Sequence, residues 1–78
     1  MFPASQINRH VGARIQLRRI RLGMSREQLA GVVGVRAAEM ELYEEGIAKV
    51  PANLLVDLAE ALSVPISYFF LDLSRTPR

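Results

Sequence analysis

Residues 23–46 read GMSREQLAGVVGVRAAEMELYEEG, and this stretch decides which fold we expect. Its apolar residues recur at helical spacing in two short segments. The first segment opens with the capping-box pattern SREQ at residues 25–28 and ends near Gly34. The second segment covers roughly residues 36–45 and stops at Gly46. The stretch therefore predicts two short helices joined by a tight turn.

Three more segments with helical spacing surround this pair. A first helix is expected over residues 8–22, a mostly apolar fourth helix over residues 51–62, and a fifth helix from Pro65 onward. We find no alternation of apolar and polar residues that would predict a strand. We therefore expect an all-α fold of five helices in a single domain, residues 1–78, with a core at residues 8–71 and loose residues at both ends.

The composition argues against several classes of protein. The chain has 78 residues, half of them apolar, with no cysteine and one histidine, so neither disulfides nor a metal cluster is expected. No basic and apolar leader opens the chain, and no stretch approaches the roughly 18 apolar residues of a membrane span. Neither a Ser-His-acid arrangement nor a glycine-rich phosphate loop is found. We expect a soluble, cytoplasmic protein without membrane contact, cofactor, metal, small-molecule ligand or enzymatic activity.

The positive charge lies in the first half of the chain. Residues 1–36 hold seven arginines against Glu27, a net charge of +6, whereas residues 37–78 hold three basic residues against seven acidic ones, a net charge of −4. Such an asymmetry favours one end that faces a polyanion. A basic face that is merely solvated is an equally good interpretation of the charges alone.

The order of the expected helices indicates a class of binding protein. A basic helix, a tight helix pair and two packing helices form the arrangement in which the second short helix enters a DNA major groove. The residues that carry a further resemblance are Val11-Gly12-x-Arg14-Ile15, Gly23-Met24-Ser25, Leu29-Ala30, Gly34-Val35, Tyr43-Glu44-Glu45-Gly46 and the closing Leu62-Ser63-Val64-Pro65. They resemble the lambda-repressor-like, Cro-type helix-turn-helix domains, also called the xenobiotic response element family. The resemblance spans roughly residues 8–71 and implies a five-helix bundle that binds operator DNA, usually as a two-fold dimer.

The resemblance implies a sequence-specific, repressor-type regulator of transcription that reads an inverted-repeat operator in double-stranded DNA as a homodimer. The base-reading candidates on the third helix are Arg36, Ala37, Ala38, Glu39 and Leu42. This helix departs from the family, whose members commonly carry Gln, Ser, Thr, Asn or Arg at its groove-facing positions. It carries Glu39 and Glu41 instead, and these two acidic residues are unfavourable on a helix that must approach phosphates. The alternative is a protein-interaction module of the same fold, antitoxin-like or anti-repressor, with weak or no DNA binding.

The DNA backbone is expected to meet the start of the second helix and the loop after the third. The candidates for phosphate contacts are Ser25, Arg26, Lys49 and Asn53. For Asn53, an ordinary role at the start of a helix is an equally good interpretation. Arg14 and Arg18 are expected to be solvated charges, and His10 a surface or partly packed side chain.

Two opposite charges fall on inward-facing helical stripes. Arg19 follows Ile15 by four residues, and Glu44 follows Met40 by four residues. Because a lone buried charge is very costly, we expect Arg19 and Glu44 to pair across the core and to fix the angle of the third helix, as the resemblance also implies. Two unrelated surface charges are the alternative.

The expected fifth helix carries more large apolar residues than one side of a helix can bury. Some of them must cover a partner, so Tyr68, Phe70 and Leu71 are candidates for the seam of a homodimer. A purely intrachain core is the alternative.

Overall fold

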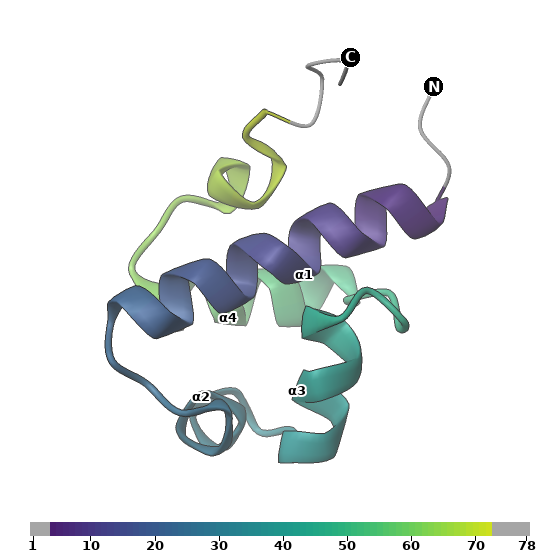
Figure 1. The fold of residues 1–78 in the computed structure, drawn as a ribbon. Coiled ribbons are helices and arrows are strands. Elements are labelled where there is room, and N and C mark those ends of the chain that lie inside the picture. The colour runs from purple at the N-terminus through teal and green to yellow at the C-terminus, as the bar shows by residue number, and fades with distance from the viewer. Residues whose placement is uncertain (1–3, 73–78) are drawn as a thin grey trace.

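The computed structural model describes residues 4–72 of the chain. Its elements are the α-helices α1 (Ala4–Arg21), α2 (Arg26–Val33), α3 (Ala37–Glu44) and α4 (Ala52–Leu62) and the 3-10 helix η1 (Ile66–Phe70) (Figure 1). The chain ends that were expected to be loose include residues 1–3 and 73–78, which lie outside this description. Within the described part, no helix is long and apolar enough to cross a membrane.

The prediction of five α-helices is wrong. In residues 4–72 the fold has four α-helices, and the segment after Pro65 forms the short 3-10 helix η1 instead of a fifth α-helix. Its backbone bonds span three residues, from the Tyr68 amide to the Pro65 carbonyl oxygen at 2.9 Å. The Tyr68 carbonyl, which would accept the residue 72 amide in a longer α-helix, accepts a hydrogen bond from Arg14 of α1. Asp72 has a φ of 68°, which takes the backbone out of the right-handed helical region.

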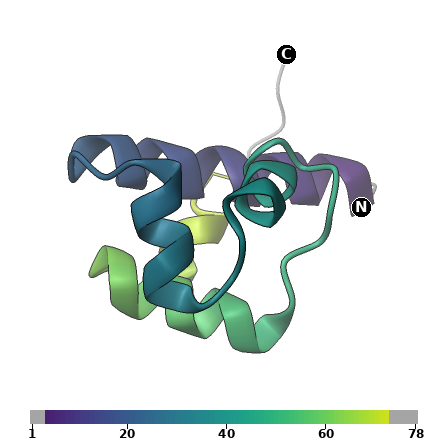
Figure 2. The ribbon, with the colours of Figure 1, turned by 90° about the horizontal axis from the view of Figure 1, so that it is seen from below.

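The long helix α1 separates α2 and α3 from η1 (Figure 1). It begins at Ala4, four residues before the expected start, and its neighbours are α3, α4 and η1. Figure 1 shows α2 and α3 on one side of α1 and η1 on the other, with α4 behind. Seen from below in Figure 2, α2 and α3 lie in front of α1 and α4, so both short helices face outward together.

The core receives side chains from all five elements. Those with essentially no exposed surface are Ile15 of α1, Leu29 of α2, Met40 of α3, Leu58 and Leu62 of α4, and Phe69 of η1. Burial of each such side chain contributes about 1.5–3 kcal/mol. Because the core of a chain this small is limited, each element depends on the others for its apolar face to be covered.

The helices α1 and α3 approach each other closely at Gly12. A Cβ atom at this position would lie 2.5 Å from the carbonyl oxygen of Glu44 and closer still to that of Tyr43. These are backbone atoms, so they cannot move aside as a flexible side chain would. Glycine at residue 12 therefore sets the distance between the two helices.

We expect Gly12→Ala to lower the free energy of unfolding by at least about 1–3 kcal/mol, because the added methyl group overpacks a rigid contact. The matched control is Gly31→Ala, in the exposed interior of α2, where an added Cβ meets no atom within 4 Å. That change should raise stability by about 0.5–1 kcal/mol through the higher helix propensity of alanine. Urea denaturation followed by circular dichroism measures both, and equal midpoints for the two variants would contradict the close approach.

Candidate nucleic-acid interface

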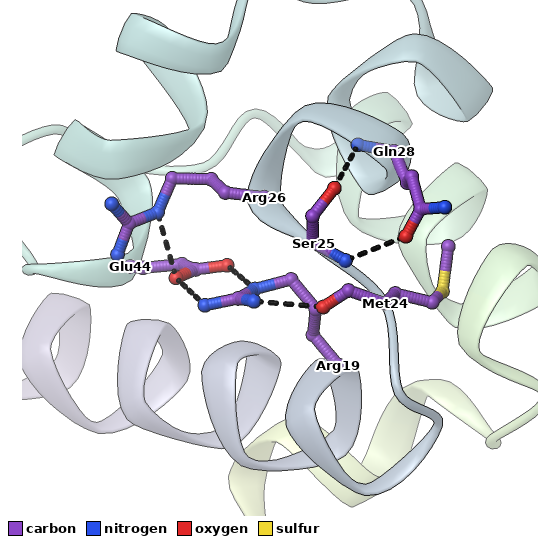
Figure 3. Close-up of polar contacts among 6 residues, drawn as sticks. All are labelled: Arg19, Met24, Ser25, Arg26, Gln28 and Glu44. Carbon is purple, nitrogen blue, oxygen red and sulfur yellow. Dashed lines mark hydrogen bonds and ion pairs between the residues drawn. The ribbon is translucent and has the colours of Figure 1, made fainter.

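The turn between α2 and α3 is fixed at both of its ends. At the start of α2, Ser25 Oγ accepts the Gln28 amide at 3.0 Å, and Gln28 Oε1 accepts the Ser25 amide at 2.7 Å (Figure 3). This is the capping box that residues 25–28 predict. At the end of α2, Gly34 has a φ of 80°, the left-handed conformation that a helix C-cap favours in glycine. The chain then enters α3 after Val35 and Arg36, which gives the tight turn of a helix-turn-helix unit.

The start of α3 uses Glu39 as a capping residue. Glu39 Oε1 accepts the backbone amide of Arg36 at 3.2 Å. The reciprocal bond of a capping box is absent because an arginine side chain has no acceptor atom. The sequence analysis assigned Glu39 to base reading and missed this second role, although its position three residues after the N-cap residue is the signal for it.

Arg19 and Glu44 form a buried ion pair between α1 and α3. Arg19 Nε donates to Glu44 Oε2 at 2.7 Å and Nη2 donates to Oε1 at 3.0 Å, while Nη1 donates to the Met24 carbonyl oxygen at 2.9 Å (Figure 3). The Glu44 side chain is fully buried, and that of Arg19 is 10% exposed. One guanidinium group thus ties α1 to α3 and to the turn that leads into α2.

A second arginine shares the same carboxylate. Arg26, the first residue of α2, donates from Nε to Glu44 Oε1 at 3.2 Å, with 29% of its side chain exposed. Figure 3 shows the two guanidinium groups on the Glu44 carboxylate. The sequence analysis placed Arg26 only on phosphate, and no local spacing links it to a residue 18 positions later. Glu44 therefore holds α1, α2 and α3 together.

The exposed residues of α3 and its N-cap are a mixture of apolar, acidic and basic side chains. Of the predicted base-reading residues, Arg36, Ala38, Glu39 and Leu42 are exposed, whereas Ala37 is half-buried. Glu41 and Glu45 are exposed as well. Among the predicted phosphate contacts, Ser25 and Arg26 meet at the start of α2, while Lys49 and Asn53 are exposed in the loop before α4 and in its first turn.

Three basic residues of α1 contact backbone carbonyl oxygens of α4, of η1 and of the residue after η1. His10 Nε2 lies 2.7 Å from the Leu71 carbonyl oxygen, Arg14 Nε donates to the Tyr68 carbonyl oxygen at 3.1 Å, and Arg18 Nε donates to the Leu62 carbonyl oxygen at 2.9 Å. We call His10, Arg14 and Arg18 the basic ladder, because they stand four residues apart on one face of α1. The guanidinium carbon of Arg14 also lies 4.1 Å from the centre of the Tyr68 ring. The expectation that Arg14 and Arg18 are merely solvated is wrong.

The residues in and directly after η1 differ in how far they are buried. Phe69 is fully buried and Tyr68 is half-buried, whereas Ile66, Phe70 and Leu71 remain 41–49% exposed. Of the three predicted seam residues, Phe70 and Leu71 thus offer open apolar surface, and Tyr68 is engaged with Arg14.

The fold and its tight turn define a helix-turn-helix protein. Residues 10–67 match the helix-turn-helix domain family, and the chain belongs to that family. This confirms the resemblance stated from the sequence.

Two relatives carry names that refer to transcription. An uncharacterized HTH-type transcriptional regulator of Sinorhizobium medicae (strain WSM419) is 44% identical over 66 residues, which cover 85% of this chain and 48% of that protein. An uncharacterized transcriptional regulator in the ATPase CF(0) region of Rhodospirillum rubrum is 44% identical over 69 residues, covering 88% of this chain and 64% of that protein. The chain thus matches about half of the first relative and just under two-thirds of the second.

Solved structures share the arrangement of helices. The restriction-modification controller protein C.AhdI from Aeromonas hydrophila superposes with a TM-score of 0.76 at 27% identity, covering 80% of this chain and 94% of that chain. The clp gene regulator ClgR from Corynebacterium glutamicum superposes with a TM-score of 0.81 at 21% identity, covering 85% of this chain and 70% of that chain. The second likeness shows the fold alone.

We expect Arg19→Met to lower the free energy of unfolding by about 3–5 kcal/mol, because Glu44 would remain buried with only Arg26 as its partner. The double change Arg19→Met with Glu44→Leu should recover most of that loss, since no buried anion is left. Arg21→Met, at an exposed arginine of the same helix, is the matched control. If thermal melts of Arg19→Met and Arg21→Met coincide, the pair does not have the role assigned to it.

Proposed function

We propose that this protein is a sequence-specific regulator of transcription that binds double-stranded DNA through α3. The observation that carries the proposal is the capped α2–turn–α3 unit, whose two helices face outward together on one side of α1. In helix-turn-helix proteins the second helix of such a unit lies in the major groove with its N-terminal residues near base edges. The names of the relatives and the family match support the same function.

The exposed residues of α3 are the proposed base readers. Arg36, at the N-cap, is suited to a guanine or a phosphate, and the methyl and methylene groups of Ala38 and Leu42 are suited to a thymine methyl. Glu39 accepts from Arg36 with Oε1, and the second oxygen of this exposed carboxylate remains suited to a cytosine amino group. Ala37 contributes less direct surface because it is half-buried.

The proposed backbone contacts come from two places. The first is the start of α2, where Arg26 keeps part of its guanidinium group exposed while Glu44 orients it. The hydroxyl of Ser25 is used in capping, so its contribution is to place the free amides of the helix start. The second place is the loop before α4, with Lys49 and the neighbouring Asn53.

We further propose that the protein acts as a homodimer and as a repressor in the cytoplasm. The exposed apolar residues Phe70 and Leu71, held in place by the basic ladder, support a seam formed by two copies of η1. Two recognition helices related by a two-fold axis would reach major grooves about 34 Å apart. In this proposal residues 1–78 form a single domain.

The second candidate function is a protein-interaction module of the same fold. The observation that favours it is the exposed acidic set Glu39, Glu41 and Glu45 on and directly after α3, which repels phosphates. A basic protein partner would complement this surface.

Selection of binding sites from random duplexes at low salt, with sedimentation of the free protein, tests the function. We expect an enriched inverted repeat and a dimer at micromolar concentration. A selected site without dyad symmetry would argue against the homodimer. Failure to enrich any duplex would argue for the protein-interaction function.

We expect Lys49→Ala to weaken binding to operator and scrambled duplexes alike and to reduce the salt slope by about one, because one phosphate contact is lost. The matched control is Arg21→Ala, since Arg21 is an exposed arginine outside α2, α3 and the loop before α4. Fluorescence anisotropy at several salt concentrations gives both slopes. Equal slopes for the two variants would remove Lys49 from the interface.

We expect Glu39→Gln to weaken the free energy of operator binding by about 1–3 kcal/mol through one C·G base pair and to relax the sequence preference at that pair. Glutamine keeps an acceptor for the Arg36 amide, so the start of α3 should stay capped. Glu41→Gln removes the same charge from the same helix and should instead tighten binding to every duplex slightly. Uniform tightening by both variants would show that Glu39 is not a base reader.

A further inference from the structure

A hollow of about 460 Å³ lies between α1, the loop before α4, the first turns of α4 and Phe70. Its walls are mainly aliphatic, with Val11 of α1 and Leu55 of α4 among them, and Phe70 of η1 is an aromatic lining residue. Its polar lining residues are Asn8 and Lys49. The volume falls within the range of sites that hold small organic molecules, about 300–1,000 Å³.

The charges of the lining select one class of occupant. Among residues 4–72, Lys49 is the charged residue that lines the hollow, and no carboxylate does so. Asn8 adds an amide that can donate hydrogen bonds. An apolar wall with a cation at its rim is complementary to a molecule with an apolar body and one anionic end.

We propose that this hollow binds an amphiphilic carboxylate, an aryl or short alkyl acid, with its apolar part against Val11, Leu55 and Phe70 and its carboxylate on Lys49. A second copy of the chain that docks through η1 is a poorer fit, because η1 contains no acidic residue to meet Lys49. The sequence analysis expected no small-molecule ligand, since residues of this hollow come from three separated segments and share no motif.

Occupancy of the hollow couples to the DNA interface, and this step rests on the proposed function. Lys49 is the loop cation assigned there to a phosphate. A carboxylate bound to Lys49 neutralises it and so weakens binding to every duplex, which makes the acid an inducer of release. Phe70 lines the hollow and also belongs to the proposed dimer seam, so the bound acid lies beside that seam.

The first test uses 4-phenylbutyrate as the probe and 4-phenylbutan-1-ol as its neutral match, titrated into the full chain without DNA. Amide shifts in nitrogen-15 spectra should change at residues of the hollow, with about tenfold weaker binding of the alcohol because the charged contact to Lys49 is missing. Lys49→Gln should lower the affinity for the acid to that for the alcohol. Arg21→Gln, which removes an exposed cation outside the hollow, should change the affinity for neither probe. Ala52→Phe, which fills the hollow from an exposed position, should weaken the binding of both probes.

Three results would overturn the proposed site. They are the absence of shifts at the hollow at millimolar probe, equal affinity for the acid and the alcohol, and loss of probe binding as the protein concentration rises. The last result would assign the hollow to a second copy.

The second test measures the affinity of the protein for the operator duplex with and without 4-phenylbutyrate. Wild-type affinity should fall with the acid, whereas Lys49→Gln, already lacking the cation, should show little further change. If the acid binds in the first test but leaves the operator affinity unchanged, the coupling is wrong while the site stands. If no duplex is bound at all, the proposed function fails and the first test still decides the site.

Discussion

The carboxylate of Glu44 is the constraint on which the arrangement of the first three helices depends. A fully buried anion is tolerated only with well-placed donors, and these come from Arg19 of α1 and Arg26 of α2. Arg19 Nη1 donates to the Met24 carbonyl oxygen, and this hydrogen bond fixes the chain just before α2. Together with the close approach at Gly12, this leaves α3 little freedom to rotate or to move away from α1. Buried charge here selects one geometry of the helix-turn-helix unit more than it adds stability.

Much of this unit follows from contacts between residues near in sequence. The capping box at residues 25–28 and the left-handed C-cap at Gly34 depend on the chain within four residues, so the sequence predicts them directly. The inward stripes that carry Arg19 and Glu44 follow from helical periodicity, and the cost of a lone buried charge then pairs them. Local rules therefore predict the binding element better than they predict its surroundings.

The elements that sequence reasoning missed depend on distant contacts. The basic ladder joins residues 44 to 61 positions apart, and no periodic pattern distinguishes its arginines from solvated ones. The wrong fifth helix has a related origin, because the Tyr68 carbonyl accepts the Leu71 amide three residues later, as in a 3-10 helix, and accepts Arg14 of α1 with its other lone pair. The role of Arg26 on Glu44 and the hollow beside Lys49 likewise arise only when separate elements pack together.

The positive charge of the first half of the chain is largely used inside the molecule. Of its seven arginines, Arg19 and Arg26 share Glu44, and Arg14 and Arg18 bind carbonyl oxygens of η1 and α4. The outward side of α3 has the exposed carboxylates of Glu39 and Glu41, with Arg36 at its N-cap as an exposed cation. A DNA interface built this way has few cations to hold phosphates without regard to sequence. Its affinity would then rest on a small number of contacts and on base reading, so the loss of a single loop cation has a large relative effect.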